Sequence, residues 1–258
     1  MEAERSHSLL GPNDPTPVRV TNPGAGSSFL LIGDHAGKAI PESLGTLGLG
    51  AADLARHIAC DIGVAGLGRL LADALDACFI EQHYSRLVID CNRPAAHGQA
   101  FAAVSDGTAI PGNAALDATA QAERFHAIQA PYQAAIAGML AERDAAGRAT
   151  ILVSLHSFTP VMRGVARPWD VGVLHDGGDP AFALALLARL RDMTPLQVGD
   201  NEPYQMDDTD HTVPLHAYPS RRPYVELEIR QDHIADTAGQ MLWTTRLAGA
   251  LRAAARHD

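Results

Sequence analysis

The sequence contains few aromatic residues, few cysteines and no long apolar run. Only 5% of the 258 residues are aromatic, and there are three cysteines: Cys60, Cys78 and Cys91. An odd number of cysteines without a CxxC spacing argues against a disulfide framework and is typical of a reducing compartment. No stretch approaches the roughly 18 apolar residues of a membrane helix. The polar, proline-broken residues 1–17 lack the basic-then-apolar order of a signal peptide. We therefore expect a cytoplasmic protein.

Positive charge is also scarce. Lysine and arginine number 20 against 30 aspartates and glutamates, which gives a formal net charge of −10. Such a surface repels nucleic-acid phosphates and anionic lipids, so we expect neither nucleic acid nor a membrane as partner. A small anion can still bind where a few arginines converge. Apolar residues make up 47% of the chain, which is ample for a core. The oligomeric state remains open.

Expected strands alternate with expected helices along the chain. The strands are Phe29–Ile32, Ala77–Ile80, Arg86–Ile89, Thr150–Leu155, Asp170–Leu174 and Tyr224–Ile229. The helices are Ala51–Leu75 with a break near Gly63–Gly68, Asp117–Asp144, Asp179–Arg191 (which begins at an aspartate cap) and Asp236–Arg256. This alternation predicts an α/β protein with helices on both faces of a sheet.

The remaining segments read as loops or as a terminal arm. Residues 95–113, 157–168 and 194–222 show little regular pattern, and the first of these loops is too long to be idle in a compact domain. Residues 1–26 mix Pro, Asn, Gly and Ser with short apolar pieces, so we expect a loosely held arm. Residues 27–258 are then expected to form a single domain.

Three of the apolar strands carry reactive side chains at or near their carboxyl ends. Asp34 and His35 follow the first, His156 and Ser157 follow the Thr150–Leu155 strand, and the Tyr224–Ile229 strand carries Glu226 and Glu228 before Arg230. Open α/β sheets bind their ligands at the carboxyl ends of the strands. The three strands therefore predict one site at one edge of the sheet.

A lone histidine after a strand is more often structural than catalytic, but His35 and His156 end two strands of one sheet. Together they indicate a shared metal, and histidine nitrogen with carboxylate oxygen suits a catalytic zinc that keeps one position open for water. His57 and Asp61 lie four residues apart on an expected helix, hence on one face. In one interpretation they are an ordinary pair on the helix surface. In the other, Asp61 is the third metal ligand and His57 orients its carboxylate.

The Asp90–Pro94 segment, DCNRP, has two interpretations. In one, Asp90 caps a turn and Arg93 is a solvated surface charge. In the other, Arg93 is a bidentate clamp for a carboxylate, with Asn92 donating beside it. Three more arginines are candidates for the same anion: Arg86, Arg163 and Arg230.

Glu226 and Glu228 point to the same face of their strand, since side chains alternate with a period of two. At most one of them is expected to be a general base, the other being paired with an arginine. Ser157 lacks the GxSxG elbow of a nucleophilic serine and is expected to form hydrogen bonds instead. Cys91 is likewise not expected to be a nucleophile.

The sequence resembles the N-formylglutamate amidohydrolase (N-formylglutamate deformylase) family at these residues. The matching pieces occur in family order between about residues 28 and 235: GDHAGKAIP (33–41), HIACDIG (57–63), YSRLVIDCNRP (84–94), IPGN (110–113), LHSFTP (155–160), NEPY (201–204), His216 and ELEIRQD (226–232). The LHSFTP and GVARPWDVGVL stretches are more similar to a less characterised branch of the family than to the enzyme of histidine degradation.

The resemblance implies a three-layer α/β/α fold with a mixed, mostly parallel sheet, similar to zinc-dependent exopeptidases. It also implies a divalent metal and hydrolysis of an amide on a small molecule that carries a carboxylate. Related zinc carboxypeptidases hold that carboxylate with an Asn-Arg pair, to which Asn92-Arg93 is similar. They also pair a histidine with a glutamate three residues later, where this chain has Lys38, and for that reason Asp61 enters the expected ligand set.

We accordingly expect a metal-dependent amidohydrolase of amino acid metabolism, acting on a small N-acyl amino acid such as N-formylglutamate. Zn²⁺, or another divalent metal, would be held by His35, Asp61 and His156. Glu228 would act as general base, and Arg163 would stabilise the oxyanion. The expected substrate contacts are Asn92, Arg93, Arg86, Arg230, Ser157, Asn201 and Tyr204. The alternatives are hydrolysis of another N-acyl amino acid or small peptide, and a non-catalytic relative that binds carboxylates.

Overall fold

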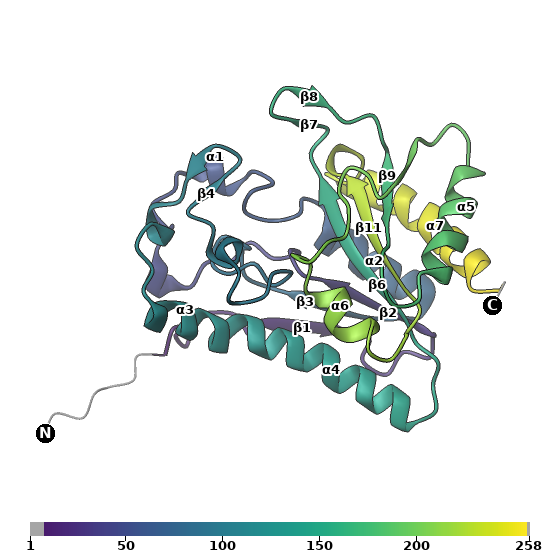
Figure 1. The fold of residues 1–258 in the computed structure, drawn as a ribbon, viewed down its shortest axis with the longest axis horizontal. Helices are drawn as coiled ribbons and strands as arrows, with labels where there is room; N and C mark the ends of the chain where they lie inside the picture. Colours follow the sequence, from purple (N-terminus) through teal and green to yellow (C-terminus); the bar gives the residue numbers. More distant parts are fainter. Residues whose placement is uncertain (1–7, 257–258) are drawn as a thin grey trace, which may run out of the picture.

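The computed structural model describes residues 8–256, which are built around a seven-stranded sheet (Figure 1). The strand order is β1-β3-β2-β6-β11-β9-β10. The strands are β1 (Val18–Thr21), β2 (Phe29–Gly33), β3 (Cys78–Gln82), β6 (Ile151–Phe158), β9 (Val171–Leu174), β10 (Val198–Asp200) and β11 (Tyr224–Arg230). The central strands β3, β2, β6 and β11 run parallel, whereas β1 and the β9–β10 pair run antiparallel to their neighbours β3 and β11. The expected mixed, mostly parallel sheet is confirmed.

Helices cover both faces of this sheet (Figure 1). One face packs against α2 (Val64–Leu75), α5 (Ala181–Arg191) and α7 (Thr237–Ala254), and the other packs against α4 (Ala130–Ala145) and α6 (Thr212–Ala217). Successive strand residues serve opposite layers, as the period of two requires: Leu31 joins the α2 side and Leu30 the α4 side. The expected three-layer α/β/α fold is confirmed.

Smaller elements occupy the segments that were expected to be loops. Residues 95–113 contain the hairpin of β4 (Val104–Ser105) and β5 (Thr108–Ala109), and residues 157–168 contain that of β7 (Val161–Met162) and β8 (Val165–Ala166). The helix expected over 117–144 is continuous but composite, because a π-helical turn, Phe125–Gln129, joins α3 (Ala118–Arg124) to α4. Helix α5 begins two residues after Asp179, whose carboxylate accepts a hydrogen bond from the Ala181 amide.

Two expected elements differ from the prediction. The stretch Ala51–Leu75 is divided into two helices as expected, but the break covers residues 55–63 instead of the region near Gly63–Gly68, so α1 (Ala51–Leu54) is only four residues long. Residues 86–89 do not form a strand: the Val88 amide donates to the carbonyl of Ser85, and the Asp90 amide donates to that of Ala100. The run reads as a strand because it is buried in the core on the α4 side. Burial, rather than strand pairing, produces its apolar pattern.

The N-terminal segment is held more firmly than expected from residue 8 onward. Strand β1 pairs with β3, and the Tyr84 hydroxyl donates to the carbonyl of Pro15 at 2.6 Å. The segment thereby covers an edge of the sheet whose backbone groups would otherwise be unpaired. The expected loose arm is therefore wrong for residues 8–26, and residues 1–7 lie outside the described residues.

The cysteines follow the expectation, since Cys60, Cys78 and Cys91 are all free, two of them buried. Within residues 8–256, no helix has the length and apolar character needed to cross a membrane.

Candidate active site

The carboxyl ends of three adjacent parallel strands open into one cavity of about 600 Å³. His35 follows β2, His156 lies within β6, and Glu226 and Glu228 lie on β11, where they are in register with Ser154 and His156. Strand β6 is longer than expected, so His156 is fixed by the sheet instead of by a loop. The structure brings the side chains of the three strands together at one edge.

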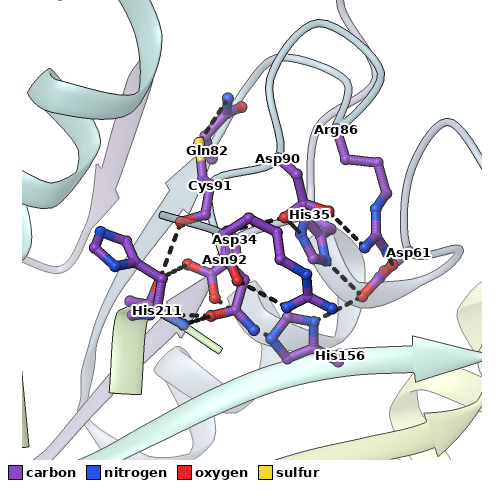
Figure 2. A network of polar contacts seen from close by, with 12 residues as sticks. Asp34, His35, Asp61, Gln82, Arg86, Asp90, Cys91, Asn92, His156 and His211 are labelled. Atoms are coloured by element: carbon purple, nitrogen blue, oxygen red, sulfur yellow. Dashed lines mark hydrogen bonds and ion pairs between the residues drawn. The ribbon is translucent and has the colours of Figure 1, made fainter. Parts of the chain in front are cut away.

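The imidazoles of His35 and His156 converge on the carboxylate of Asp61 (Figure 2). The Asp61 Oδ2 atom lies 3.0 Å from His156 Nδ1 and 3.6 Å from His35 Nδ1. All three side chains are buried, and their candidate ligand atoms lie within 4.8 Å of one another. His35 Nδ1 has no hydrogen-bond partner among the described residues. The cluster therefore brings together three side chains that commonly bind metals, and one of their nitrogen atoms, His35 Nδ1, is left without a hydrogen bond.

The other nitrogen of each imidazole faces a second carboxylate. His35 Nε2 lies 2.7 Å from Asp90 Oδ1, and His156 Nε2 lies 3.4 Å from Asp34 Oδ2 and 3.1 Å from Ser154 Oγ. Burial alone would lower the pKa of both histidines, but the surrounding carboxylates outweigh it and raise both pKa values. Carboxylates in this position fix the tautomer and orientation of metal-ligating histidines.

Asp61 is positioned by partners other than the expected His57. Its Oδ2 accepts a hydrogen bond from the Ser157 amide at 3.2 Å, and its Oδ1 lies 3.4 Å from Arg86 Nη1. Burial would raise the pKa of the Asp61 carboxyl, but the two histidines hold it well below its usual value. His57 is instead 3.5 Å from Asp106. The predicted role of His57 fails because residues 55–60 are not helical, so the four-residue spacing does not place both side chains on one face.

Arg86 lines the cavity between two carboxylates. It lies 2.7 Å from Asp90 Oδ2 as well as 3.4 Å from Asp61 Oδ1. These acids overcome the effect of burial and raise the pKa of the guanidinium further, so the side chain stays charged. Arg86 thus connects Asp61 and Asp90, the partners of the two histidines.

Asn92 and Arg93 lie together in the cavity wall, but an internal carboxylate already contacts both. Asp210 Oδ1 accepts hydrogen bonds from Asn92 Nδ2 and Arg93 Nη1, each at 3.2 Å. Asn92 Oδ1 also accepts from the amides of His211 and Thr212 (Figure 2). These hydrogen bonds fix the positions of both side chains, and one donor of each is already occupied by Asp210.

Two glutamines of the helical segment that runs from α3 to α4 donate hydrogen bonds to the backbone around Asn92 and Arg93. Gln129 Nε2, from the π-helical turn, donates to the carbonyl of Arg93 at 2.7 Å, and Gln133 Nε2 donates to that of Cys91 at 2.9 Å. π-helical turns inside α-helices are frequent at functional sites.

Glu226 and Glu228 both face the cavity and are 3% and 6% exposed. Neither Oε2 atom has a hydrogen-bond partner in the part of the chain that the structure describes. Burial, against the opposing charge of His156, raises the pKa of each carboxyl to about 8. The expected pairing of one glutamate with an arginine is wrong for residues 8–256, since no ion pair with arginine forms at either.

Three expected site residues do not line the cavity: Arg163, Asn201 and Arg230. Arg163 is exposed in the two-residue turn between β7 and β8, where it and Gly164 have φ values of 50° and 81°. Asn201 Oδ1 accepts a hydrogen bond from the His175 amide, and Arg230 Nε donates to Asp232. Asn201 and Arg230 thus support the scaffold.

Ser157 and Tyr204 do line the cavity, and Tyr204 brings an arginine that sequence reasoning missed. Arg167 Nη1 donates to the Tyr204 hydroxyl at 2.9 Å, and its guanidinium lies 4.8 Å from the centre of that ring. Sequence reasoning also missed Asp90 as a partner of His35, and Asp210. Asp34 was placed at the expected site but was given no role. Asp90 had a usable signal, since it follows an apolar run beside predicted site residues, whereas Asp210 lies in a segment without pattern.

Comparisons with known proteins agree with this architecture. The N-formylglutamate amidohydrolase family model matches residues 27–235. The crystal structure of a gene product of Agrobacterium tumefaciens is 37% identical, with a TM-score of 0.93 over 96% of this chain and 98% of that one. The crystal structure of N-formylglutamate amidohydrolase from Ralstonia eutropha JMP134 is 18% identical, with a TM-score of 0.66 over 94% of this chain and 98% of that one, and shows a similar fold. No curated protein sequence matches significantly. The chain belongs to the N-formylglutamate amidohydrolase family.

Proposed function

We propose that this protein is a metal-dependent amidohydrolase that removes the formyl, or another small acyl, group from an N-acyl amino acid. Its family supports amide hydrolysis in general. The metal and the substrate are the parts that we propose. The observation that carries the proposal is the convergence of His35 Nδ1 and His156 Nδ1 on Asp61 Oδ2.

The residues of the cluster fit a divalent cation such as Zn²⁺. Two imidazole nitrogens and one carboxylate oxygen are a common ligand set for catalytic zinc. His35 Nδ1 lacks a partner although it is buried, and the opposite nitrogens of both rings are held by Asp90 and Asp34. When bound, such an ion polarises a carbonyl oxygen and lowers the pKa of a water molecule toward about 7.

Glu228 is the proposed general base. It is in register with His156, lines the same cavity and has a free Oε2 atom. A base with a pKa raised toward neutrality is suited to proton transfer near pH 7. It takes a proton from the attacking water and delivers it to the amide nitrogen as the carbon–nitrogen bond breaks, which releases the carboxylic acid of the acyl group and a free amine.

Cationic side chains in the wall provide the remaining functions. Arg86 takes the oxyanion-stabilising role that was expected of Arg163, because Arg86 lies in the cavity wall beside Asp61. Preorganised donors of this kind stabilise developing negative charge. Arg93 contacts Asp210 through Nη1 and can donate its other N–H groups to a substrate carboxylate. Asn92, Ser157 and Tyr204 complete the proposed substrate contacts.

The test is metal content measured together with hydrolysis. We expect about one divalent ion per chain, and chelation should abolish the hydrolysis of N-formyl amino acids. His35→Ala and His156→Ala should each lose the ion. His57→Ala is the matched control, because it removes an imidazole of the same cavity that is not part of the cluster. A metal-free preparation with full activity would refute the proposal.

A further inference from the structure

The cavity contains many more negative than positive side chains. Seven carboxylates line it, against two arginines and three histidines. A divalent ion at the histidine cluster would offset only part of this excess. The substrate must therefore enter a cavity whose fixed charge is negative, although the expected substrate, N-formylglutamate, carries two carboxylates of its own.

Neither arginine is available to neutralise the remaining acids. Arg86 is shared between Asp90 and Asp61, and Arg93 lies 3.2 Å from Asp210. Two further lining carboxylates have partners outside the cluster: Asp106 pairs with Arg56, and Asp207 accepts hydrogen bonds from Thr209. Glu226 and Glu228 are left over, and the proposed function uses Glu228 as the base.

Glu226 is the carboxylate without an assigned role. Its Oε2 atom is buried and has no hydrogen-bond partner among residues 8–256. The nearest histidine nitrogen, His156 Nε2, is 4.0 Å away and is closer to Asp34 and Ser154. Asp210 and Glu228 add to the negative field around Glu226. A buried carboxylate oxygen that has no hydrogen bond, and whose nearest imidazole is 4.0 Å away and closer to two other groups, is costly, so a ligand that brings a positive charge would bind favourably there.

We propose that Glu226, assisted by Asp210, binds an ammonium group of the substrate. The inference rests on the proposed function and narrows it: the substrate is an N-acyl amino acid with a cationic side chain, and its carboxylate contacts Arg93. An ammonium group donates charge-assisted hydrogen bonds to carboxylates, whereas a second substrate carboxylate would meet Glu226 and Asp210 as like charges.

The experiment compares three substrates with the same scissile amide and the same α-carboxylate: Nα-formyl-lysine, Nα-formyl-norleucine and Nα-formyl-glutamate. Their side chains differ chiefly in charge, which is positive, absent and negative in turn. Using holoenzyme, we expect kcat/KM to be about 10- to 100-fold higher for the lysine compound than for the norleucine compound, the ratio given by one charge-assisted hydrogen bond. The glutamate compound should be the poorest substrate.

Substitutions then test which residues produce the preference for the lysine compound. Glu226→Gln should remove most of the ratio between the lysine and norleucine compounds, and Asp210→Asn, a second variant in case the first fails to fold, should reduce it. Asp208→Asn is the matched control: it removes an exposed carboxylate from the segment that contains Asp210 but does not line the cavity. Equal losses on all three substrates in Glu226→Gln would overturn the inference, because Glu226 would then act in the chemical step.

A ratio of one or less between the lysine and norleucine compounds would also overturn the inference, while leaving amide hydrolysis intact. If no compound is hydrolysed, the proposed function fails, and calorimetric titration with lysine and norleucine still decides on the ammonium site. Lysine should then bind about 10-fold more tightly than norleucine, and Glu226→Gln should abolish the difference. Equal binding of the two would refute the site.

Discussion

The two faces of the central strands differ in how far their apolar character extends. On the face toward α2 and α7, β11 is apolar to its end, with Leu227 and Ile229 in the core. On the face toward α4, the same strand begins with the buried Tyr224 but continues with Glu226 and Glu228. Strand β6 shows the same division, with Leu155 on the first face and His156 on the second. Neighbouring residues of one strand thus serve different purposes.

The difference shows how a buried reactive site is accommodated in this fold. The fully apolar face supplies stabilisation through burial, at about 25 cal/mol per Å² of apolar surface. The other face gives up that stabilisation at its carboxyl-terminal end, where it buries carboxylates and imidazoles instead. Substitutions at adjacent positions should therefore separate stability from activity.

The largest effect is expected for Glu228→Gln, on the polar face. Glutamine retains the size of the side chain but cannot take up the proton, so kcat should fall by about 10² to 10⁴. Thermal stability should rise, because the uncharged amide replaces an unpaired buried carboxylate. Steady-state kinetics and thermal unfolding check the two results, with metal content near that of the native protein. If Glu226→Gln shows the loss in kcat and Glu228→Gln does not, the two assignments must be exchanged.

One residue away, Leu227→Ala should have the opposite consequences. Leu227 is fully buried on the apolar face, so its truncation should lower the free energy of unfolding by about 2–5 kcal/mol. The kcat of the folded fraction should remain near that of the native protein, since the side chain points away from the cavity. Urea unfolding and kinetics at low temperature test this. A large loss of kcat in fully folded protein would show that the two faces are not independent.

A smaller effect is expected at His216, in the helical layer over the polar face. Burial lowers the pKa of this histidine from 6.5 to about 4, and its Nε2 lies 2.7 Å from Gln133 Oε1. Between these two pH values, His216 is therefore protonated in the unfolded chain but neutral in the folded protein. Stability from this group is present above pH 6.5 and is lost as the pH falls toward 4.

His216→Gln should remove this contribution and flatten the dependence of the unfolding free energy on pH in that window. Urea unfolding of both proteins at several pH values measures it. Parallel profiles for the native protein and the variant would contradict the expectation.

The sequence predicted the fold well where apolar runs belong to the sheet. Strand β2 was recognised because it is apolar throughout, as is typical of a strand buried on both faces, and β6 and β11 were recognised from their apolar residues at every second position. The same pattern misled at residues 86–89, where an apolar run is buried under a helix but folded as turns. An apolar pattern reports burial, whereas strand pairing depends on neighbours that are distant in the sequence.

The same distinction explains which site residues were found. His35, His156 and Glu228 follow or lie in apolar strands, and strand ends of one parallel sheet must meet. Asp210 lines the cavity and Arg167 contacts the lining residue Tyr204, both from irregular segments, where neither periodicity nor spacing indicates direction. Arg163 was expected in the site because the sequence did not show that Arg163-Gly164 forms the tip of a hairpin.

The order of strands in the sheet determines when the site can exist during folding. His35 and Glu228 are separated by most of the chain, and only the β2-β6-β11 arrangement places them at one cavity. Partly folded forms that lack β11 therefore contain no complete site. A ligand that binds the assembled cluster stabilises the finished sheet alone, by mass action, and not the intermediates that precede it. Contacts of such long sequence separation form slowly. Occupancy of the site is therefore possible only in molecules whose central strands have all assembled.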